Sequence, residues 1–427
     1  RGFNRFIDIY YWWLLGLSQG SHTYWSWYVA NGIKPQRAQF IQWEMKHQYF
    51  LAGMRSRAET AVLLSSRSNN LIREPGGFIN RSNSFVALCG NLTMAQIPYK
   101  VLVDQDLGQE LTGRANTIIA MNIPLLSDAQ ADRLRRFVEN GGTLIASAAT
   151  SLYDENGNRR SNFALADLFG CDYDKEVTSG ASLVIAKPSP LFGNVAGTIP
   201  HPESFFAVKP RRNAAVPGVM RASGMRDAPG IIVNRHGKGQ CIYFSGHPET
   251  LLYFTQVAGT LILPRSYGEP ERDRNMAELF AALVRNSAND IVRFENLPPG
   301  VVVETYDHDY RDARGIQVHL LNMAGMTNRE GTPETERIHY PDIRTILPEP
   351  GKPVTVVIDA QDINSVYMFS PDFDGLYEIP MEKNGSTATV KLPAFRRYAV
   401  LYFNRGHRDA LLKLANLEVK KGFPEIE

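Results

Sequence analysis

The stretch that decides the fold is LLSDAQADRLRRFVENGGTLIASAATSLYDENGNRRSNFALADLFG, residues 125–170. It opens with a helix signal, because Ser127 and Gln130 have the spacing of a capping box. Apolar residues then recur at helical spacing as far as Gly141, a residue type that favours helix ends. The run TLIASA at 143–148 follows at once and is typical of a strand buried on both faces. A helix between buried strands predicts a largely parallel α/β sheet with right-handed crossovers.

Further buried strands are expected on both sides of this stretch. Between 172 and 245 the pattern changes to extended segments, including a hairpin whose turn is centred on Lys238. A helix with one apolar face is expected at 273–286. We therefore predict a doubly wound α/β sheet for residues 57–288. The other buried strands are predicted from short continuous apolar runs at 59–65, 99–104 and 117–121.

The two ends of the chain have different patterns. Residues 1–56 read as helix, strand, helix, and such a piece must dock on something, because a parallel strand needs neighbours on both sides. Residues 289–406 contain strand patterns separated by turn residues at intervals of roughly ten positions, which is the mark of an antiparallel sandwich. Residues 407–427 read as a surface tail or a terminal helix.

Composition and charge narrow the class of protein. A length of 427 residues predicts two or three domains. A net charge of +2 and dispersed basic residues argue against a nucleic-acid partner. The apolar run IYYWWLLGL is too short to span a bilayer, so no membrane partner is expected. Three cysteines that lie far apart argue against a disulfide framework and against a paired-cysteine zinc site. The compartment stays undecided, with the cytoplasm favoured.

Motifs for phosphate binding and for a cysteine nucleophile are not found where the predicted sheet would carry them. The turn after the first strand, SSRSNNLI at 65–72, has no glycine to cradle a phosphate, so no nucleotide cofactor is expected. The segments after the third and fourth strands, where a nucleophilic cysteine would lie, contain none. Cys171 is therefore expected to be a core or loop thiol.

Histidines and acids elsewhere give two further interpretations. His236 and His247 are expected to be hydrogen-bonded loop residues. His308 lies between Asp307 and Asp309 and could bind a cation through their oxygens, although a solvated hairpin tip is the favoured interpretation. No metal or other cofactor is expected.

Residues 125–170 closely resemble the trimerisation domain of family-42 β-galactosidases, an amidotransferase-like flavodoxin fold that follows a TIM barrel and precedes a small antiparallel β domain. The order of segments is the same here, with VHLLNMAG at 318–325 as the characteristic strand of the β domain. The resemblance implies four parts: the C-terminal end of a (β/α)8 barrel at 1–56, the amidotransferase-like domain at 57–288, a β-sandwich at 289–406 and a tail at 407–427.

The resemblance gives a role to the aromatic stretch SHTYWSWYVANG, residues 21–32. It would be the eighth barrel strand running into its loop, and barrel active sites lie at the C-terminal ends of the strands. A flat indole ring can stack on the apolar face of a sugar, so the resemblance implies that this strand lines a carbohydrate subsite. The alternative is an aromatic strand that packs the barrel core against its outer helices. The candidate substrate-binding residues are Trp25, Trp27, Tyr24 and His22.

Catalytic residues are not expected in this chain. Retaining glycosidases use two carboxylates about 5 Å apart, and the resemblance places them on barrel strands that would precede Arg1. Asp8 and Glu44 each lie in a predicted helix, which is the wrong place for either role. We expect the C-terminal part of a longer glycoside hydrolase, or a chain that pairs with a barrel-bearing one. The alternative is a non-catalytic assembly or carbohydrate-binding protein with a degenerate amidotransferase-like domain.

The resemblance also implies a homo-oligomer, expected to be a trimer, in which the middle domain packs against a neighbouring barrel. The candidate contact is the loop at 151–162, with Tyr153, Asn156 and Arg159. Its Asn-Gly sequence equally fits the turn of a solvated hairpin tip.

Overall fold

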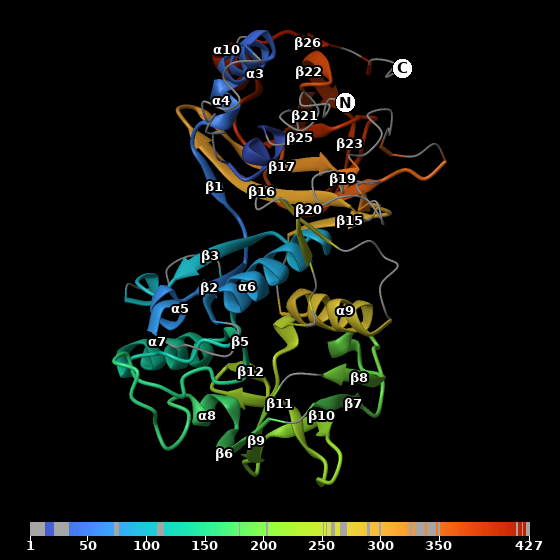
Figure 1. Cartoon of the computed structure of the whole chain (residues 1–427). Helices are drawn as coiled ribbons and strands as arrows, with labels where there is room; N and C mark the ends of the chain where they lie inside the picture. Colours follow the sequence, from blue (N-terminus) through green and yellow to red (C-terminus); the bar gives the residue numbers. More distant parts are fainter. Residues whose placement is uncertain are drawn as a thin grey trace. The chain divides into compact units, whose positions relative to one another are not determined.

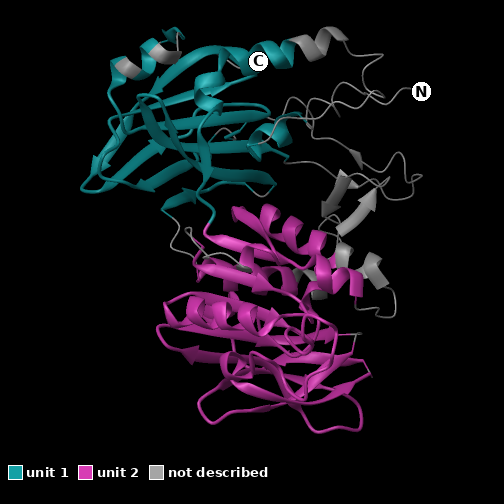
Figure 2. Ribbon diagram, turned by 90° about the vertical axis from the view of Figure 1, so that its left-hand side faces the viewer, with its two compact units in different colours: residues 1–58, 290–427 teal, residues 59–289 magenta. Residues whose placement is uncertain are grey.

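The computed structural model of the chain divides into two compact units (Figure 2). The terminal unit consists of residues 1–58 together with 290–427, and the middle unit consists of residues 59–289. The structure describes residues 13–20, 34–71, 77–108, 115–178, 180–201, 204–250, 252, 254–257, 261–264, 271–287, 291–298, 300–323, 327–328, 338–339, 347–348, 351–415, 417–420 and 422–423.

The middle unit is built on a nine-stranded sheet with the order β3-β2-β4-β5-β12-β11-β10-β7-β8 (Figure 1). Neighbours from β3 to β12 are parallel, and neighbours from β12 to β8 are antiparallel. The strands are β2 (Thr60–Leu64), β3 (Tyr99–Val103), β4 (Thr117–Ala120), β5 (Thr143–Ser147), β7 (Ala181–Ile185), β8 (Gly197–His201), β10 (Ala215–Arg221), β11 (Ala228–His236) and β12 (Gly239–Phe244).

Two small sheets complete the strands of the middle unit. They are the antiparallel pairs β6 (Cys171–Val177) with β9 (Phe205–Pro210) and β13 (Phe254–Val257) with β14 (Leu261–Pro264). A mixed α/β fold with several sheets is thus confirmed. Most of the extended segments expected at 172–245 continue the main sheet rather than forming one of their own.

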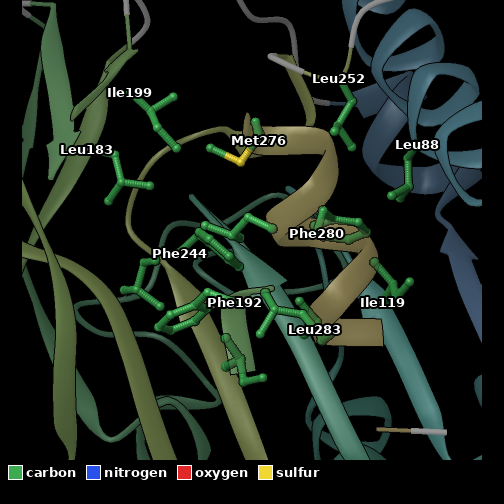
Figure 3. Packing of buried hydrophobic residues seen from close by; sticks show 14 of the residues in the cluster. Leu88, Ile119, Leu183, Phe192, Ile199, Phe244, Leu252, Met276, Phe280 and Leu283 are labelled. Carbon is green, nitrogen blue, oxygen red and sulfur yellow. The ribbon is translucent and has the colours of Figure 1, made fainter. Parts of the chain in front are cut away.

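Helices cover both faces of the parallel strands. Strand residues alternate between two apolar clusters, so that Val62 belongs to one cluster while Ala61 and Leu63 belong to the other. Figure 3 shows the first cluster, where Met276 and Phe280 extend from one helix toward the sheet. The helices of the first cluster are α6 (Gly77–Met94) and α9 (Glu271–Arg285), and those of the second are α7 (Asp128–Glu139) and α8 (Ala166–Phe169). A short helix, α5 (Ser66–Leu71), follows β2.

The predicted capping box at the start of α7 is confirmed. Ser127 Oγ accepts the Gln130 backbone N–H group at 3.2 Å, and Gln130 Oε1 accepts the Ser127 N–H group at 3.0 Å. Gln130 Nε2 also donates to the carbonyl oxygen of Asp104 at 2.8 Å. One side chain therefore closes the first turn of the helix and ties it to the end of β3.

The terminal unit contains a β-sandwich. A seven-stranded sheet, β1-β16-β17-β25-β21-β22-β26, and a four-stranded sheet, β15-β20-β24-β23, both contribute to one apolar cluster. The strands are β1 (Met54–Ser56), β15 (Val292–Glu295), β16 (Val301–Tyr310), β17 (Ala313–Asn322), β20 (Thr355–Asp359), β21 (Ser365–Ser370), β22 (Phe373–Ile379), β23 (Met381–Asn384), β24 (Thr387–Lys391), β25 (Tyr398–Asn404) and β26 (Val419–Lys420), with a separate pair β18 (Thr327–Asn328) and β19 (Ile338–His339).

The N-terminal segment docks on the other face of the seven-stranded sheet. β1 pairs with β16, and Trp13, Phe40 and Phe50 are buried in an apolar cluster with residues of β21 and β25. The helices in this layer are the one at 13–18, α3 (Lys34–Lys46), α4 (Gln48–Leu51) and α10 (Arg408–Ala415). The docking expected for residues 1–56 is therefore observed for their described part. None of the described helices combines the length and the apolar character that a bilayer crossing requires.

Candidate functional site

The predicted substrate-binding residues His22, Tyr24, Trp25 and Trp27 lie outside the described residues. The structure describes the two helices that flank them in sequence, at 13–18 and at α3. These helices pack on the seven-stranded sheet.

Part of the sheet face that receives the N-terminal segment is polar, beside the apolar cluster that contains Trp13, Phe40 and Phe50. Side chains alternate along β16, so that Val301 and Val303 point into the sandwich core while Glu304 and Tyr306 belong to the opposite face. We call the buried polar residues of this opposite face the polar face. It comprises Glu304, Tyr306, His308, Gln317, His319, Tyr398 and Tyr402.

Each histidine of the polar face bonds through both ring nitrogens. His308 lies with Nε2 2.8 Å from the Tyr49 carbonyl oxygen and Nδ1 3.1 Å from the Tyr402 hydroxyl. His319 lies with Nε2 2.8 Å from Gln317 Oε1 and Nδ1 2.5 Å from the Tyr398 hydroxyl. A neutral ring that donates from Nε2–H and accepts a tyrosine O–H group at Nδ1 satisfies both partners of each histidine.

Burial sets the charge state of this face. It lowers the pKa of His319 to about 3 and raises the pKa of Glu304 to about 8, although the hydrogen bond from Gln19 partly offsets the rise for Glu304. Burial also lowers the pKa of His308. Glu304 and His319 are direct partners across β16 and β17, and both are uncharged at pH 7. The hydrogen bonds of Glu304 and His319 are therefore formed by neutral groups, whereas ion pairs join Arg57 to Asp307 and Lys46 to Asp374 elsewhere between the N-terminal segment and the sheet.

The interpretation of His308 as a solvated hairpin tip is wrong. His308 is 2% exposed within β16, and the turn lies beyond it at Arg311 and Asp312. Its neighbour Asp307 forms an ion pair with Arg57. The three consecutive polar residues were interpreted as a solvated tip, but the N-terminal segment covers His308 through Tyr49. Within the described ranges, no group of three or more His, Cys, Asp or Glu side chains could hold a metal ion.

Glu44 lies in α3, as its sequence position predicted, and is hydrogen-bonded to another helix. Trp13 Nε1 donates to Glu44 Oε1 at 2.6 Å, and the Trp13 ring stacks on Phe40 with centroids 4.4 Å apart. These contacts join the helix at 13–18 to α3. The carboxylate therefore serves to pack two helices together.

The carboxyl ends of the parallel strands in the middle unit carry a buried polar group. Ser147 Oγ donates to Glu249 Oε2 at 3.0 Å, and His247 Nδ1 lies 3.1 Å from Glu249 Oε1. The carboxylate thus stands between the hydroxyl and the imidazole, whereas a nucleophilic serine needs the imidazole next to it. Ala148 follows β5 with a φ of +50° and is fully buried. This strand end holds alanine where a nucleophile would be expected.

The three cysteines are buried, and burial raises the pKa of Cys89 and Cys171 to about 12 and that of Cys241 well above its usual value. Their thiols stay protonated and unreactive, which agrees with the expectation for Cys171. His236 ends β11, with Nε2 3.3 Å from Glu139 Oε1.

The loop at 151–162 is ordered by its own hydrogen bonds. Asp154 Oδ1 accepts the N–H groups of Asn156 and Asn158 at 2.9 and 2.8 Å, and the bonds from Asn158 lower the pKa of Asp154. The Arg159 guanidinium lies 5.0 Å from the Tyr173 ring centroid. Asn156 and Arg159 are exposed, and Tyr153 is half-buried. The loop presents polar side chains at the surface, which is compatible with either candidate role.

Together these features define a mixed α/β protein with several sheets. Residues 58–262 match the family model described as the β-galactosidase trimerisation domain. The resemblance to family-42 β-galactosidases is confirmed.

Solved structures with the same fold include several glycosidases. The β-galactosidase from Rahnella sp. R3 is 15% identical and has a TM-score of 0.58 over 88% of this chain and 45% of its own. The family-42 β-galactosidase from G. stearothermophilus is 17% identical, with a TM-score of 0.55 over 87% of this chain and 44% of its own. The α-L-fucosidase isoenzyme 2 from Paenibacillus thiaminolyticus is 12% identical, with a TM-score of 0.64 over 92% and 56%.

The chain spans about half the length of the solved structures that it matches. Among curated proteins, no sequence matches it.

Proposed function

We propose that this chain is the C-terminal part of a retaining glycoside hydrolase that resembles β-galactosidase. It supplies the last substrate-lining strand of a barrel, the trimerisation domain and the β-sandwich, while the catalytic carboxylates belong to another stretch of polypeptide. The observation that carries the proposal is the match of residues 58–262 to the β-galactosidase trimerisation domain. The docked N-terminal helices and the β-sandwich, which precede and follow this domain in the sequence, support it.

The outer surface of α3 supports the assignment of residues 1–56 to the end of a barrel. Phe40 is buried against the sheet, whereas Ile41 and Met45 are 46% and 65% exposed. These two residues are one helical turn apart and form an apolar stripe facing away from the packed side. Such a stripe fits a barrel helix that packs on neighbouring barrel elements.

The strand order of the middle unit supports a flavodoxin-like, amidotransferase-like fold. The parallel strands follow the order second, first, third, fourth, fifth along the chain, and helices lie on both faces. Ala148 at the end of the fourth parallel strand fits a domain of this type that has no nucleophile.

The sugar is not settled by these similarities. A family-42 β-galactosidase and an α-L-fucosidase match the chain with comparable TM-scores, and one fold can carry different specificities. The test is hydrolysis of a panel of nitrophenyl glycosides, galactosides and fucosides included, by the full-length gene product, beside this chain as the matched control. We expect turnover by the full-length product and none by this chain. Lack of turnover on the whole panel would reject the proposal.

A second candidate is a non-catalytic assembly or carbohydrate-binding protein. It is favoured by the arrangement of Ser147, Glu249 and His247, which does not form a catalytic triad. An upstream coding sequence without carboxylates at the ends of its fourth and seventh barrel strands would support this candidate over the enzyme.

A further inference from the structure

Asparagine followed by glycine is the most reactive pair of this kind in a polypeptide, and the sequence contains it at 31–32, 140–141, 156–157 and 384–385. Because glycine has no side chain to shield its backbone nitrogen, that nitrogen can attack the side-chain carbonyl carbon of the asparagine. The structure describes all of these pairs except 31–32. The three described asparagines are all exposed, so access to water does not distinguish them. The hydrogen bonding of the glycine nitrogen does.

The glycine nitrogen is engaged in two of the three pairs. The Gly157 N–H group donates to the Asp154 carbonyl oxygen at 3.1 Å, and the Gly141 N–H group donates to the Val138 carbonyl oxygen at 2.9 Å. The Asp154 carboxylate also accepts the N–H group of Asn156 at 2.9 Å. A nitrogen that donates a hydrogen bond inside a closed turn is held away from the neighbouring side chain and keeps its proton. These two pairs are therefore protected by their backbone.

The third pair lies in an open turn of the β-sandwich. The ladder between β23 and β24 ends at Asn384 and Thr387, so Gly385 and Ser386 form a two-residue hairpin turn. Gly385 has a φ of +61°, and a Cβ atom added there would meet nothing within 4 Å. The Gly385 N–H group forms no hydrogen bond with any described residue. Its nitrogen is therefore open to solvent and free to react.

The end of this hairpin can also open at little cost. In an extended strand the asparagine side chain is not aligned with the next nitrogen, so the last pair of the ladder must separate before a ring can close. β23 is the edge strand of the four-stranded sheet, and Glu382, Lys383 and Asn384 are all exposed on it. Separation of the last pair uncovers little buried surface, and such ends open readily in folded proteins.

We propose that Asn384 is a site of spontaneous deamidation. The Gly385 nitrogen loses its proton to a solvent base and forms a bond to Asn384 Cγ, and the Cγ–Nδ2 bond breaks to release ammonia. Water then opens the cyclic imide at either of its carbonyl carbons, which gives aspartate or isoaspartate at this position. Water is the other reactant, and nothing is oxidised or reduced. The inference does not depend on the function proposed above.

The two products have different consequences for the hairpin. Each adds a negative charge at the exposed turn. Isoaspartate also carries the backbone through the former side chain, which lengthens β23 by one carbon atom and disturbs its register with β24. Met381, at the other end of β23, pairs with Val390 and packs against the apolar cluster of the sandwich. The isoaspartate form is therefore expected to loosen β23, whereas the aspartate form retains the hairpin.

Peptide mapping by mass spectrometry of the folded 427-residue chain, incubated at pH 7 and pH 8, tests the site. We expect conversion at Asn384 to be at least about tenfold faster than at Asn140 or Asn156, because local opening limits it least there. Conversion should be faster at pH 8, since the attacking nitrogen must lose its proton. In urea, where the protecting bonds are lost, the three rates should agree within about threefold. Equal rates in the folded chain, or the same order in urea, would overturn the proposal.

Two variants test the protection and the consequence. Asp154→Ala removes the acceptor for the Asn156 N–H group, and we expect conversion at Asn156 to rise at least about threefold. Conversion at Asn384 in the same molecules is the internal control and should not change. An unchanged rate at Asn156 would overturn the protective role of these bonds.

Asn384→Asp supplies the charge without the longer backbone and is the matched control for the isoaspartate form, which ion exchange separates from the unmodified chain. We expect lower hydrogen-exchange protection of β23 and β24 in the isoaspartate form and wild-type protection in Asn384→Asp. Equal protection in the two would overturn the predicted loosening of β23.

Discussion

Ser147 and Glu249 lie 102 positions apart in the sequence, and the Ser147 hydroxyl donates to the Glu249 carboxylate at 3.0 Å within the buried interior of the middle unit. The bond joins the end of β5 to the segment after β12. Ser147 Oγ also accepts the backbone N–H group of Asn122 at 3.0 Å. One hydroxyl thus connects three strand ends on the carboxyl edge of the sheet.

Removal of the carboxylate should therefore destabilise the middle unit. Glu249→Ala withdraws a partner from both Ser147 and His247, and we expect the free energy of unfolding to fall by about 2–4 kcal/mol. Urea unfolding gives the free energy of unfolding of each variant. Hydrogen exchange of β5 and β12 shows whether the loss lies at these strands. Glu176→Ala, at an exposed position on β6, is the matched control and should change stability by less than about 0.5 kcal/mol. Equal effects of the two changes would contradict a structural role for the bond.

The helix cap of α7 makes a smaller contribution. Ser127→Ala removes the acceptor for the Gln130 N–H group, and we expect a loss of about 1 kcal/mol. Ser161→Ala, an exposed change in the loop at 151–162, should be neutral. Thermal unfolding of the two variants under identical conditions compares them, and a Ser127→Ala variant as stable as the wild type would show that the cap is dispensable.

The turn between β11 and β12 requires glycine for close packing. A Cβ atom at Gly239 would collide with the carbonyl oxygens of Gly142 and Val138, whereas one at Gly157 meets nothing within 4 Å. Gly239→Ala should therefore cost at least about 3 kcal/mol or prevent folding, since backbone must move. Gly157→Ala should cost only about 1–2 kcal/mol from its φ of +85°. Soluble yield and thermal unfolding compare the two variants. A Gly157→Ala variant that is less stable than Gly239→Ala would refute the requirement for glycine at position 239.

Stability of the terminal unit should depend on pH in two opposite ways. The pKa of His319 is about 3 in the folded chain and about 6.5 when unfolded, so its contribution is present above pH 6.5 and is lost as the pH falls toward 3. The pKa of Glu304 is about 8, so its contribution is present below about pH 4.5 and is lost as the pH rises through 8. Each slope is at most about 1.4 kcal/mol per pH unit.

Tryptophan fluorescence can report unfolding of the terminal unit at each pH without the middle unit, because all five tryptophans lie within the first 43 residues. His319→Gln should reduce the loss of stability between pH 6 and 4 relative to the wild type, even if the variant is less stable at pH 7. His236→Gln, in the middle unit, should leave the profile reported by tryptophan unchanged. If stability falls equally steeply between pH 6 and 4 in His319→Gln and in the wild type, another group causes the pH dependence.

Association should depend on the tip of the loop at 151–162 if it contacts a neighbouring subunit. Arg159→Glu reverses an exposed charge at that tip, and we expect at least a tenfold weaker trimer. Light scattering at micromolar concentration gives the mass, with Arg226→Glu, also exposed, as the matched control. A wild-type chain that is a stable monomer would reject the trimer. If Arg159→Glu has the same mass as a trimeric wild type, the subunit contact does not depend on Arg159.

Local signals accounted for the middle unit well. The buried parallel strands were predictable from unbroken apolar runs such as 60–64, because a strand covered on both faces has no polar side. The capping box correctly predicted the residue at which α7 starts. These features depend on neighbours in sequence, and sequence shows them directly.

The polar face could not be predicted in the same way. Alternation along β16 gave the correct strand, but its polar side resembles a solvent-facing one, and the partner that covers it comes from the first 58 residues. His308 was misread for this reason. Burial of Glu304 likewise depends on a contact 285 positions away, which composition and periodicity do not encode. The four candidate residues of the aromatic stretch remain predictions.

The split construction of the terminal unit has a consequence for synthesis on the ribosome. Its first layer leaves the ribosome before the middle unit, but β25, at the middle of the sheet that covers Trp13 and Phe50, ends at Asn404. At cellular elongation rates the interval is on the order of tens of seconds. During that time Trp13 and Phe50 lack the sheet that covers them in the folded chain, so their apolar surface is open to association with other chains.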